Sequence, residues 1–91
     1  MLNERECYIC GATEGLEVHH CLQGKFRQLA DEDGLMVYLC HKHHTGSFNS
    51  AHHNKRMREE LTQLAQMRYL ENHSYQEWIA RYGKNYLPHL S

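Results

Sequence analysis

Apolar and polar positions in the first half of the chain follow the pattern of two short β-strands. Residues 16–22 read LEVHHCL, in which apolar positions alternate with polar ones at a period of two. Residues 35–39 read LMVYL, an apolar, β-branched and aromatic run that leads directly into Cys40. The intervening residues 23–34 are polar and contain two glycines, which predicts a loop with room for one helical turn over residues 26–30. We therefore expect a hairpin with a long connection.

From Ser50 onward the apolar period changes to 3.6, the period of an amphipathic helix. The apolar positions that fall near one face of this helix are Met57, Leu61, Leu64, Ala65 and Leu70. Ser74 and Glu77 have the spacing of a capping box, which predicts that a second, short helix begins there. Gly83 suits the end of that helix, and residues 86–88 then predict an extended tail that packs back on the core.

The length of 91 residues predicts a single domain, residues 1–91, whose core is too small to be stable without a staple. No stretch reaches the roughly 18 apolar residues of a membrane span, so we expect no membrane partner. The charged N-terminal residues predict no signal peptide. We therefore expect a cytoplasmic protein, in whose reducing compartment four cysteines favour metal binding over disulfides.

Two pairs of residues have the spacing of zinc half-sites. Cys7 and Cys10 are separated by two residues, as are Cys40 and His43, and the pairs lie 30 residues apart. One tight turn can present both ligands of such a pair to a tetrahedral Zn²⁺. The alternatives are unrelated thiols or a Cys7–Cys10 disulfide. Histidines at positions 41, 43 and 44 all follow Cys40, but only His43 keeps the spacing.

Nine histidines in 91 residues indicate metal binding, and several of them cluster away from the zinc pairs. His19 and His20 are adjacent at the end of the first predicted strand, where neighbouring side chains point to opposite faces. Their roles should therefore differ, with one binding a metal and the other acting as a general base. His44 and His52 are predicted to lie within reach of the same place. The alternative for His19 and His20 is a solvent-facing pair.

The formal net charge of −1 does not favour nucleic acid, but the charge is unevenly distributed. Residues 1–20 carry a charge of −3 and residues 51–91 a charge of +2. The cations that flank the predicted histidine site and could contact phosphates are Lys25, Arg27, Lys55, Arg56 and Arg58. An ordinary solvated face is the alternative interpretation of this set.

The Cys and His spacings together resemble the HNH (His-Me finger) endonucleases. The resemblance extends over Gly24-Lys-Phe-Arg27, residues 34–40 and the closing residues 82–87, and it is nearest to small HNH-type proteins of phages and prophages. That group includes a RecA-dependent nuclease type from phage. The resemblance implies an α+β fold, with a zinc-stapled ββα-metal (treble-clef) core followed by C-terminal helices.

The resemblance also implies a role for each matching residue. His20 matches the general base, and His19 matches the first metal ligand, usually Asp in the family. His43 stands where the family has the second Cys of its zinc pair, and His44 matches the second metal ligand. His52 lies near the spacing of a further ligand.

Two positions depart from the family pattern. The middle Asn of the family, which orients the base, has no counterpart in residues 33–35, so the backbone or Asn54 is expected to replace it. His19 in place of Asp makes the second site rich in nitrogen, which favours Zn, Ni or Mn over Mg.

The sequence therefore predicts a metal-dependent endonuclease that hydrolyses DNA phosphodiesters in the cytoplasm of a bacterial or phage-infected cell. Its cofactors would be a structural zinc and a second divalent metal (Mg, Mn, Ni or Zn), and a recombination or phage protein would be a further partner. The alternative is a non-catalytic zinc-binding module that docks nucleic acid or protein. The two hypotheses differ in the number of metals per chain, two for the enzyme and one for the module.

Overall fold

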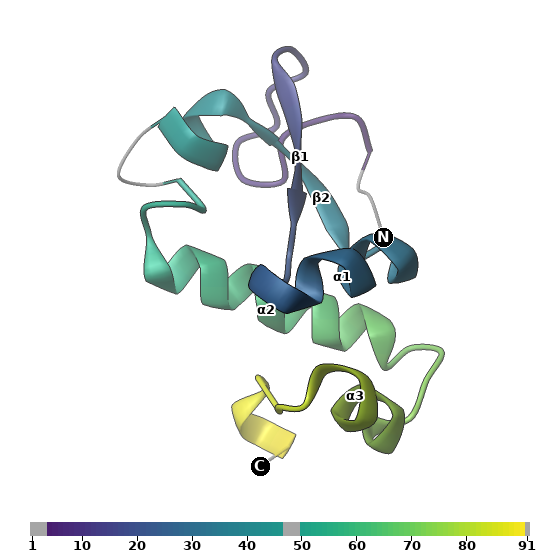
Figure 1. The fold of residues 1–91 in the computed structure, drawn as a ribbon. Coiled ribbons are helices and arrows are strands. Elements are labelled where there is room, and N and C mark those ends of the chain that lie inside the picture. The colour runs from purple at the N-terminus through teal and green to yellow at the C-terminus, as the bar shows by residue number, and fades with distance from the viewer. Residues whose placement is uncertain (1–3, 47–49, 91) are drawn as a thin grey trace.

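A computed structural model describes residues 4–46 and 50–90, and a two-stranded antiparallel sheet forms its upper part in Figure 1. Strand β1 (Leu16–His20) pairs with β2 (Met36–Cys40), and the register sets Leu16 opposite Cys40 and His20 opposite Met36. The predicted hairpin is confirmed. β1 ends at His20, two residues earlier than the alternation suggested.

The two faces of the sheet differ in burial. His19 is opposite Val37 and Glu17 is opposite Leu39, so these four side chains share one face. His19, Val37 and Leu39 are buried there, whereas Val18 on the other face is 42% exposed. The sheet thus turns a histidine, rather than the apolar Val18, toward the core.

The connection between the strands is helical over most of its length, so the single helical turn predicted over residues 26–30 is present but longer, and the rest of the predicted loop is wrong. A 3₁₀ turn (Gly24–Phe26) leads into helix α1 (Arg27–Asp33), which ends at Gly34 with a left-handed φ of 71°. Ala30 is fully buried, and its carbonyl accepts hydrogen bonds from the N–H groups of Gly34 and Leu35. Burial of Ala30 and a glycine C-cap stabilise a helix that is longer than the one turn predicted from the sequence.

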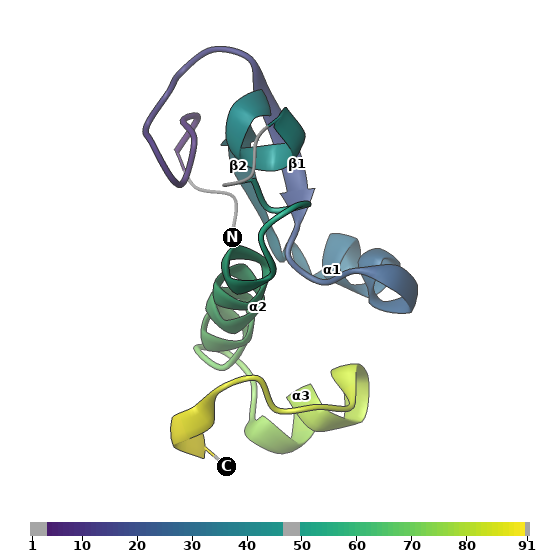
Figure 2. The ribbon, with the colours of Figure 1, turned by 90° about the vertical axis from the view of Figure 1, so that its left-hand side faces the viewer.

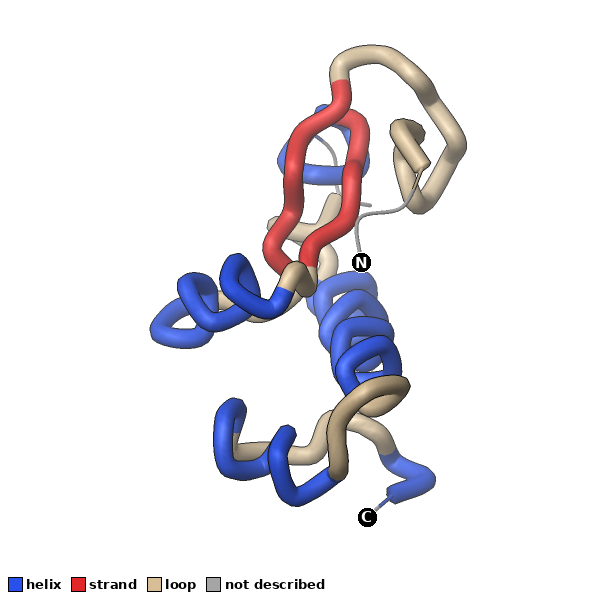
Figure 3. Tube along the Cα trace, turned by 90° about the vertical axis from the view of Figure 1, so that its right-hand side faces the viewer, coloured by secondary structure: helices blue, strands red, loops and turns tan. Residues whose placement is uncertain are grey.

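Helix α2 (Lys55–Tyr69) is the longest element, and Figures 2 and 3 show the hairpin on one side of it and α3 on the other. The helix predicted from Ser50 onward begins at Lys55, because Asn54 is extended and its side chain accepts from the N–H of Met57. Leu61 and Ala65 are buried, and the Thr62 hydroxyl donates to the carbonyl of Cys21.

Helix α3 (Tyr75–Tyr82) begins with the predicted capping box, in which Ser74 and Glu77 bond each other's backbone N–H. Trp78 and Tyr82 are almost fully buried beside Tyr69. The tail packs back through Leu87, 3% exposed, as expected, but it ends in a 3₁₀ turn (Pro88–Leu90) rather than extended chain.

The chain is a small mixed α/β structure with a Cys/His cluster beside its sheet. No helix in the two described ranges combines the length and apolarity that a bilayer crossing requires.

Candidate metal centres and the cleft beside His20

Three cysteines and one histidine converge at the open end of the hairpin. The ligand atoms of Cys7, Cys10, Cys40 and His43 all lie within 4.8 Å of one another. The Sγ atoms of Cys10 and Cys40 are 3.8 Å apart, and Nδ1 of His43 lies 3.2 Å from Sγ of Cys40. A tetrahedral ion with Zn–S bonds of about 2.3 Å sets two sulfurs roughly 3.8 Å apart, so the donor set fits zinc.

The structure separates the alternatives that the sequence left open at this cluster. All four cysteines are free thiols, which excludes the Cys7–Cys10 disulfide. Of the histidines after Cys40, His43 lies with the three sulfurs while His44 lies in a second group. Cys21 is buried outside both groups, and burial raises the pKa of its thiol to about 12.

Cys7 is the buried ligand of this cluster, with 2% of its surface exposed. Burial works against its thiolate, but hydrogen bonds from the backbone of Cys40, Cys10 and Ile9 outweigh burial and lower its pKa to about 6. The site thus favours the thiolate form that binds metal.

A second group consists of His19, His44 and His52, whose ligand nitrogens also lie within 4.8 Å of one another. The Nε2 atoms of His44 and His52 are 3.2 Å apart, and the His19 ring stands edge-on to both. With metal–nitrogen bonds of about 2.1 Å, two neighbouring ligand nitrogens lie roughly 3.0–3.4 Å apart, so the donor set fits a divalent ion. The structure thus brings together the three residues predicted to bind the second metal.

Burial disfavours charge at this second group. Burial and the neighbouring His44 and His52 lower the pKa of His19 to about 4, and burial and His44 lower the pKa of His52. Neutral imidazoles keep the lone pairs that metal binding requires.

Glu17 holds His44 in place, a role that sequence reasoning missed. Nδ1 of His44 donates to Oε1 of Glu17 at 2.7 Å, and Nδ1 of His41 donates to Oε2 at 3.2 Å. Hydrogen bonds from His44 and His41 lower the pKa of Glu17. With its Nδ1 engaged, His44 presents Nε2 to the group, the arrangement in which a carboxylate orients a metal-binding histidine.

Backbone hydrogen bonds connect the two groups. The N–H of Ala51 donates to the carbonyl of His43 at 2.7 Å, and the N–H of His52 donates to that of His44 at 3.1 Å. The segment that carries His52 is therefore fixed to the helical turn Lys42–Gly46, which supplies one ligand to each group.

His20 lies on the opposite face of β1 from His19 and has a different partner. Its Nε2 donates to Oδ1 of Asp31 in α1 at 3.2 Å, so Nδ1 is the ring nitrogen that carries the lone pair. Asp31 thus orients His20. The prediction of Asn54 for this role is wrong, because the Asn54 side chain caps α2.

The predicted phosphate-binding cations separate into two groups and one outlier. Lys25 and Arg27 line a hollow of about 590 Å³ together with His20 and Asp31. Lys55 and Arg58 line a neighbouring hollow, whereas the Arg56 side chain is 89% exposed, is paired with Glu60 and lines none of the hollows described. Arg56 belongs to the solvated face.

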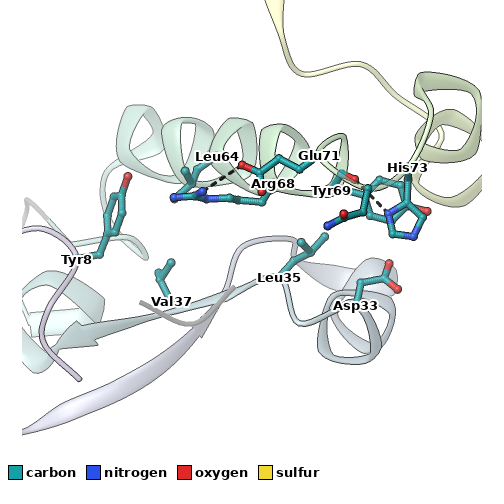
Figure 4. A pocket seen from close by; sticks show the side chains of 10 residues that line it. Tyr8, Asp33, Leu35, Val37, Leu64, Arg68, Tyr69, Glu71 and His73 are labelled. Atoms are coloured by element: carbon teal, nitrogen blue, oxygen red, sulfur yellow. Dashed lines mark hydrogen bonds and ion pairs between the residues drawn. The ribbon is translucent and has the colours of Figure 1, made fainter. Parts of the chain in front are cut away.

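A further hollow, of about 430 Å³, lies between β2 and the C-terminal half of α2 (Figure 4). Leu35, Val37 and Leu64 line it, and Arg68 forms an ion pair with Glu71 at its edge. None of the residues predicted to bind metal, act as the base or contact phosphate lines it. We therefore do not assign the predicted site to this hollow.

No family model, no curated protein and no solved structure matches this chain at a significant level. The functional argument therefore depends on the geometry of the two metal-ligand groups and of His20.

Proposed function

We propose that this chain is a metal-dependent DNA endonuclease of the HNH type with a structural zinc. The observation that carries the proposal is the arrangement around β1. A nitrogen-rich metal-ligand group lies on one face of the strand, and a carboxylate-oriented histidine lies on the other face.

The structural zinc would be held by Cys7, Cys10, Cys40 and His43 as the staple of a treble-clef-like core. The donor set matches a closed structural site, with four protein ligands and no position left for substrate. A core this small needs such a staple.

His20 would act as the general base. Its Nδ1 accepts a proton from water, while Asp31 holds the ring through Nε2 and stabilises the charge that develops on it. Lys25 and Arg27 would bind phosphate oxygens in the hollow beside His20 and so position the scissile group.

His19, His44 and His52 would hold the second divalent metal, with Glu17 orienting His44. When bound, that metal supplies Lewis-acid stabilisation of negative charge on the phosphate and on its leaving oxygen. This group favours the enzyme over the zinc-module alternative, since a module needs only the first group.

The proposal also covers the setting that the resemblance implies. The substrate would be DNA in the cytoplasm of a bacterial or phage-infected cell, with a recombination or phage protein as a further partner.

The test combines plasmid nicking with metal analysis. Wild-type chain should nick plasmid when Mg²⁺, Mn²⁺, Ni²⁺ or Zn²⁺ is supplied. His20→Ala should keep both metals and lose about 10²–10⁴-fold in nicking rate, the usual contribution of a general base. His44→Ala should keep zinc but lose the second metal, and His53→Ala, at the exposed neighbour of His52, is the control that keeps both.

A wild type that nicks nothing with any of the four metals would overturn the enzyme, and one zinc per chain would then favour the binding module. A His20→Ala variant as active as wild type would instead remove His20 as the general base.

A further inference from the structure

The hollow beside His20 is the first of three that follow one another along the molecule. Lys25 lines this first hollow and also lies over the ring of Phe26, which lines the next one, of about 290 Å³. That middle hollow shares Glu59 and Tyr86 with a third, of about 220 Å³. We call this path, from His20 to Lys84, the aromatic groove.

Two aromatic rings line the middle hollow, and each has a lysine over it. Nζ of Lys25 is 5.1 Å from the centroid of Phe26, and Nζ of Lys84 is 5.3 Å from that of Tyr86. Both rings are half-buried and packed at an angle against buried aromatics, Phe26 on Tyr82 and Tyr86 on Trp78. Packing of this kind fixes the orientation of each ring.

The groove is also cationic, in contrast to the chain as a whole. Among the side chains that line its three hollows, five are cationic (Lys25, Arg27, Lys55, Arg58 and Lys84) and two are anionic (Asp31 and Glu59). The formal charge of the whole chain is −1, so positive charge is concentrated along this path. A polyanion would be attracted to it.

We propose that the aromatic groove binds single-stranded DNA and leads it to His20. This inference deepens the proposed nuclease function and depends on it for the reaction at the end of the groove. A single strand presents phosphates and bases in alternation, and the groove presents lysines and aromatic rings in alternation. Lysines bind the phosphate backbone, while aromatic rings stack on the faces of the bases.

The two rings favour an unpaired strand over a duplex. In a duplex each base face is covered by the next base pair, and only base edges are open in the grooves. Phe26 and Tyr86 lie in a hollow rather than on a protruding wedge, so they would stack only on bases that have already left the helix. Stacking of this kind tolerates every base, which predicts binding without sequence preference.

The test measures binding without cleavage. Zinc-loaded chain without a second metal is titrated onto a fluorescent single strand of about 16 nucleotides, and onto the duplex of the same sequence, by fluorescence anisotropy. The single strand should bind more tightly. Tyr86→Leu should weaken single-strand binding about 5- to 10-fold and leave duplex binding unchanged. A loss of this size lies toward the lower end of the range for removing the stacking of one base on an aromatic ring.

A second variant tests the charge. Lys84→Gln should reduce the slope of log affinity against log salt by about 0.7 for the single strand. Two controls lie outside the groove. Tyr75→Leu removes an aromatic ring that is 41% exposed on α3, and Arg68→Gln removes a cation paired with Glu71. Melting temperatures of all variants show whether the fold is retained.

The proposal is overturned if the duplex binds as tightly as the single strand, or if Tyr75→Leu weakens binding as much as Tyr86→Leu does. The outcome is distinct from that of the nuclease test. If the chain binds the single strand through Tyr86 but never nicks plasmid, the result would support the aromatic groove as a binding site and contradict the nuclease proposal. If the chain nicks plasmid but Tyr86→Leu does not change single-strand binding, the result would support the nuclease proposal and contradict binding in the aromatic groove.

Discussion

The two metal-ligand groups of this chain are assembled in different ways. The Cys₃His group combines two local pairs, each with its two ligands three positions apart, and the hairpin brings the pairs together. The His₃ group takes one ligand each from β1, from the turn Lys42–Gly46 and from the segment before α2. The first group needs two turns and one strand pairing, whereas the second needs most of the tertiary structure around it.

This difference predicts a hierarchy between the groups. His43 and His44 are consecutive, and the carbonyls of both residues accept hydrogen bonds from the segment that carries His52. Losing the first group should therefore disrupt the second, while losing the second should leave the first intact.

The largest effect is expected from Cys10→Ser. Zinc binding contributes on the order of 10 kcal/mol to the folding of small zinc domains, so losing one ligand should leave the chain largely unfolded. Cys10 is exposed, so the substitution itself removes no core packing. Circular dichroism, thermal melting and zinc content measure the result.

Cys21→Ala is the matched control for Cys10→Ser, because Cys21 is buried but belongs to neither group. This control should keep zinc and a cooperative melting transition. A Cys10→Ser variant that melts at the wild-type temperature would contradict the staple.

A smaller effect, confined to the second group, is expected from Glu17→Gln. Removing the charge that orients His44 should weaken binding of the second metal by about 10- to 100-fold and leave the zinc in place. Isothermal titration of Mn²⁺ or Ni²⁺ into zinc-loaded chain measures the affinity. Glu14→Gln, at an exposed glutamate outside both groups, should bind as wild type does. Equal affinities in the two variants would leave Glu17 without a positioning role.

The smallest effect is expected in the helical half, from Ser74→Ala. Loss of the cap of α3 should cost about 1 kcal/mol and lower the melting temperature by about 4–8 °C, with both metals retained. Ser74→Asn should recover most of this loss, because Asn caps helices as well as Ser does. If Ser74→Ala released zinc, the two halves would depend on each other more strongly than their contacts suggest.

The parts of the fold that the sequence could predict are those with local rules. The spacing of Cys7 and Cys10 predicts one tight turn, and the spacing of Ser74 and Glu77 predicts the start of one helix. The opposite faces of His19 and His20 follow from the period of a strand alone, and the structure places the two side chains accordingly.

The missed features depend on contacts between distant positions. Helix α1 is polar except at Leu29 and Ala30, and it is anchored by Asp33, which accepts hydrogen bonds from Arg81 and Tyr82 nearly 50 residues away. Glu17 reaches His44 over 27 positions, and Asp31 reaches His20 over 11. No spacing rule connects such pairs, because the fold alone determines their separation.

The adjacency of His43 and His44 also determines where this chain can change in length. Consecutive residues of a helical turn point in different directions, which lets one backbone segment contribute to two metal-ligand groups at once. A single inserted residue between Cys40 and His43 would rotate both histidines and displace a ligand from each group together. Residues 11–15 carry no ligand and are mostly exposed, so insertions there should be tolerated. Length variation among natural or engineered versions of this protein should therefore concentrate before β1 and be absent from Cys40 to His44.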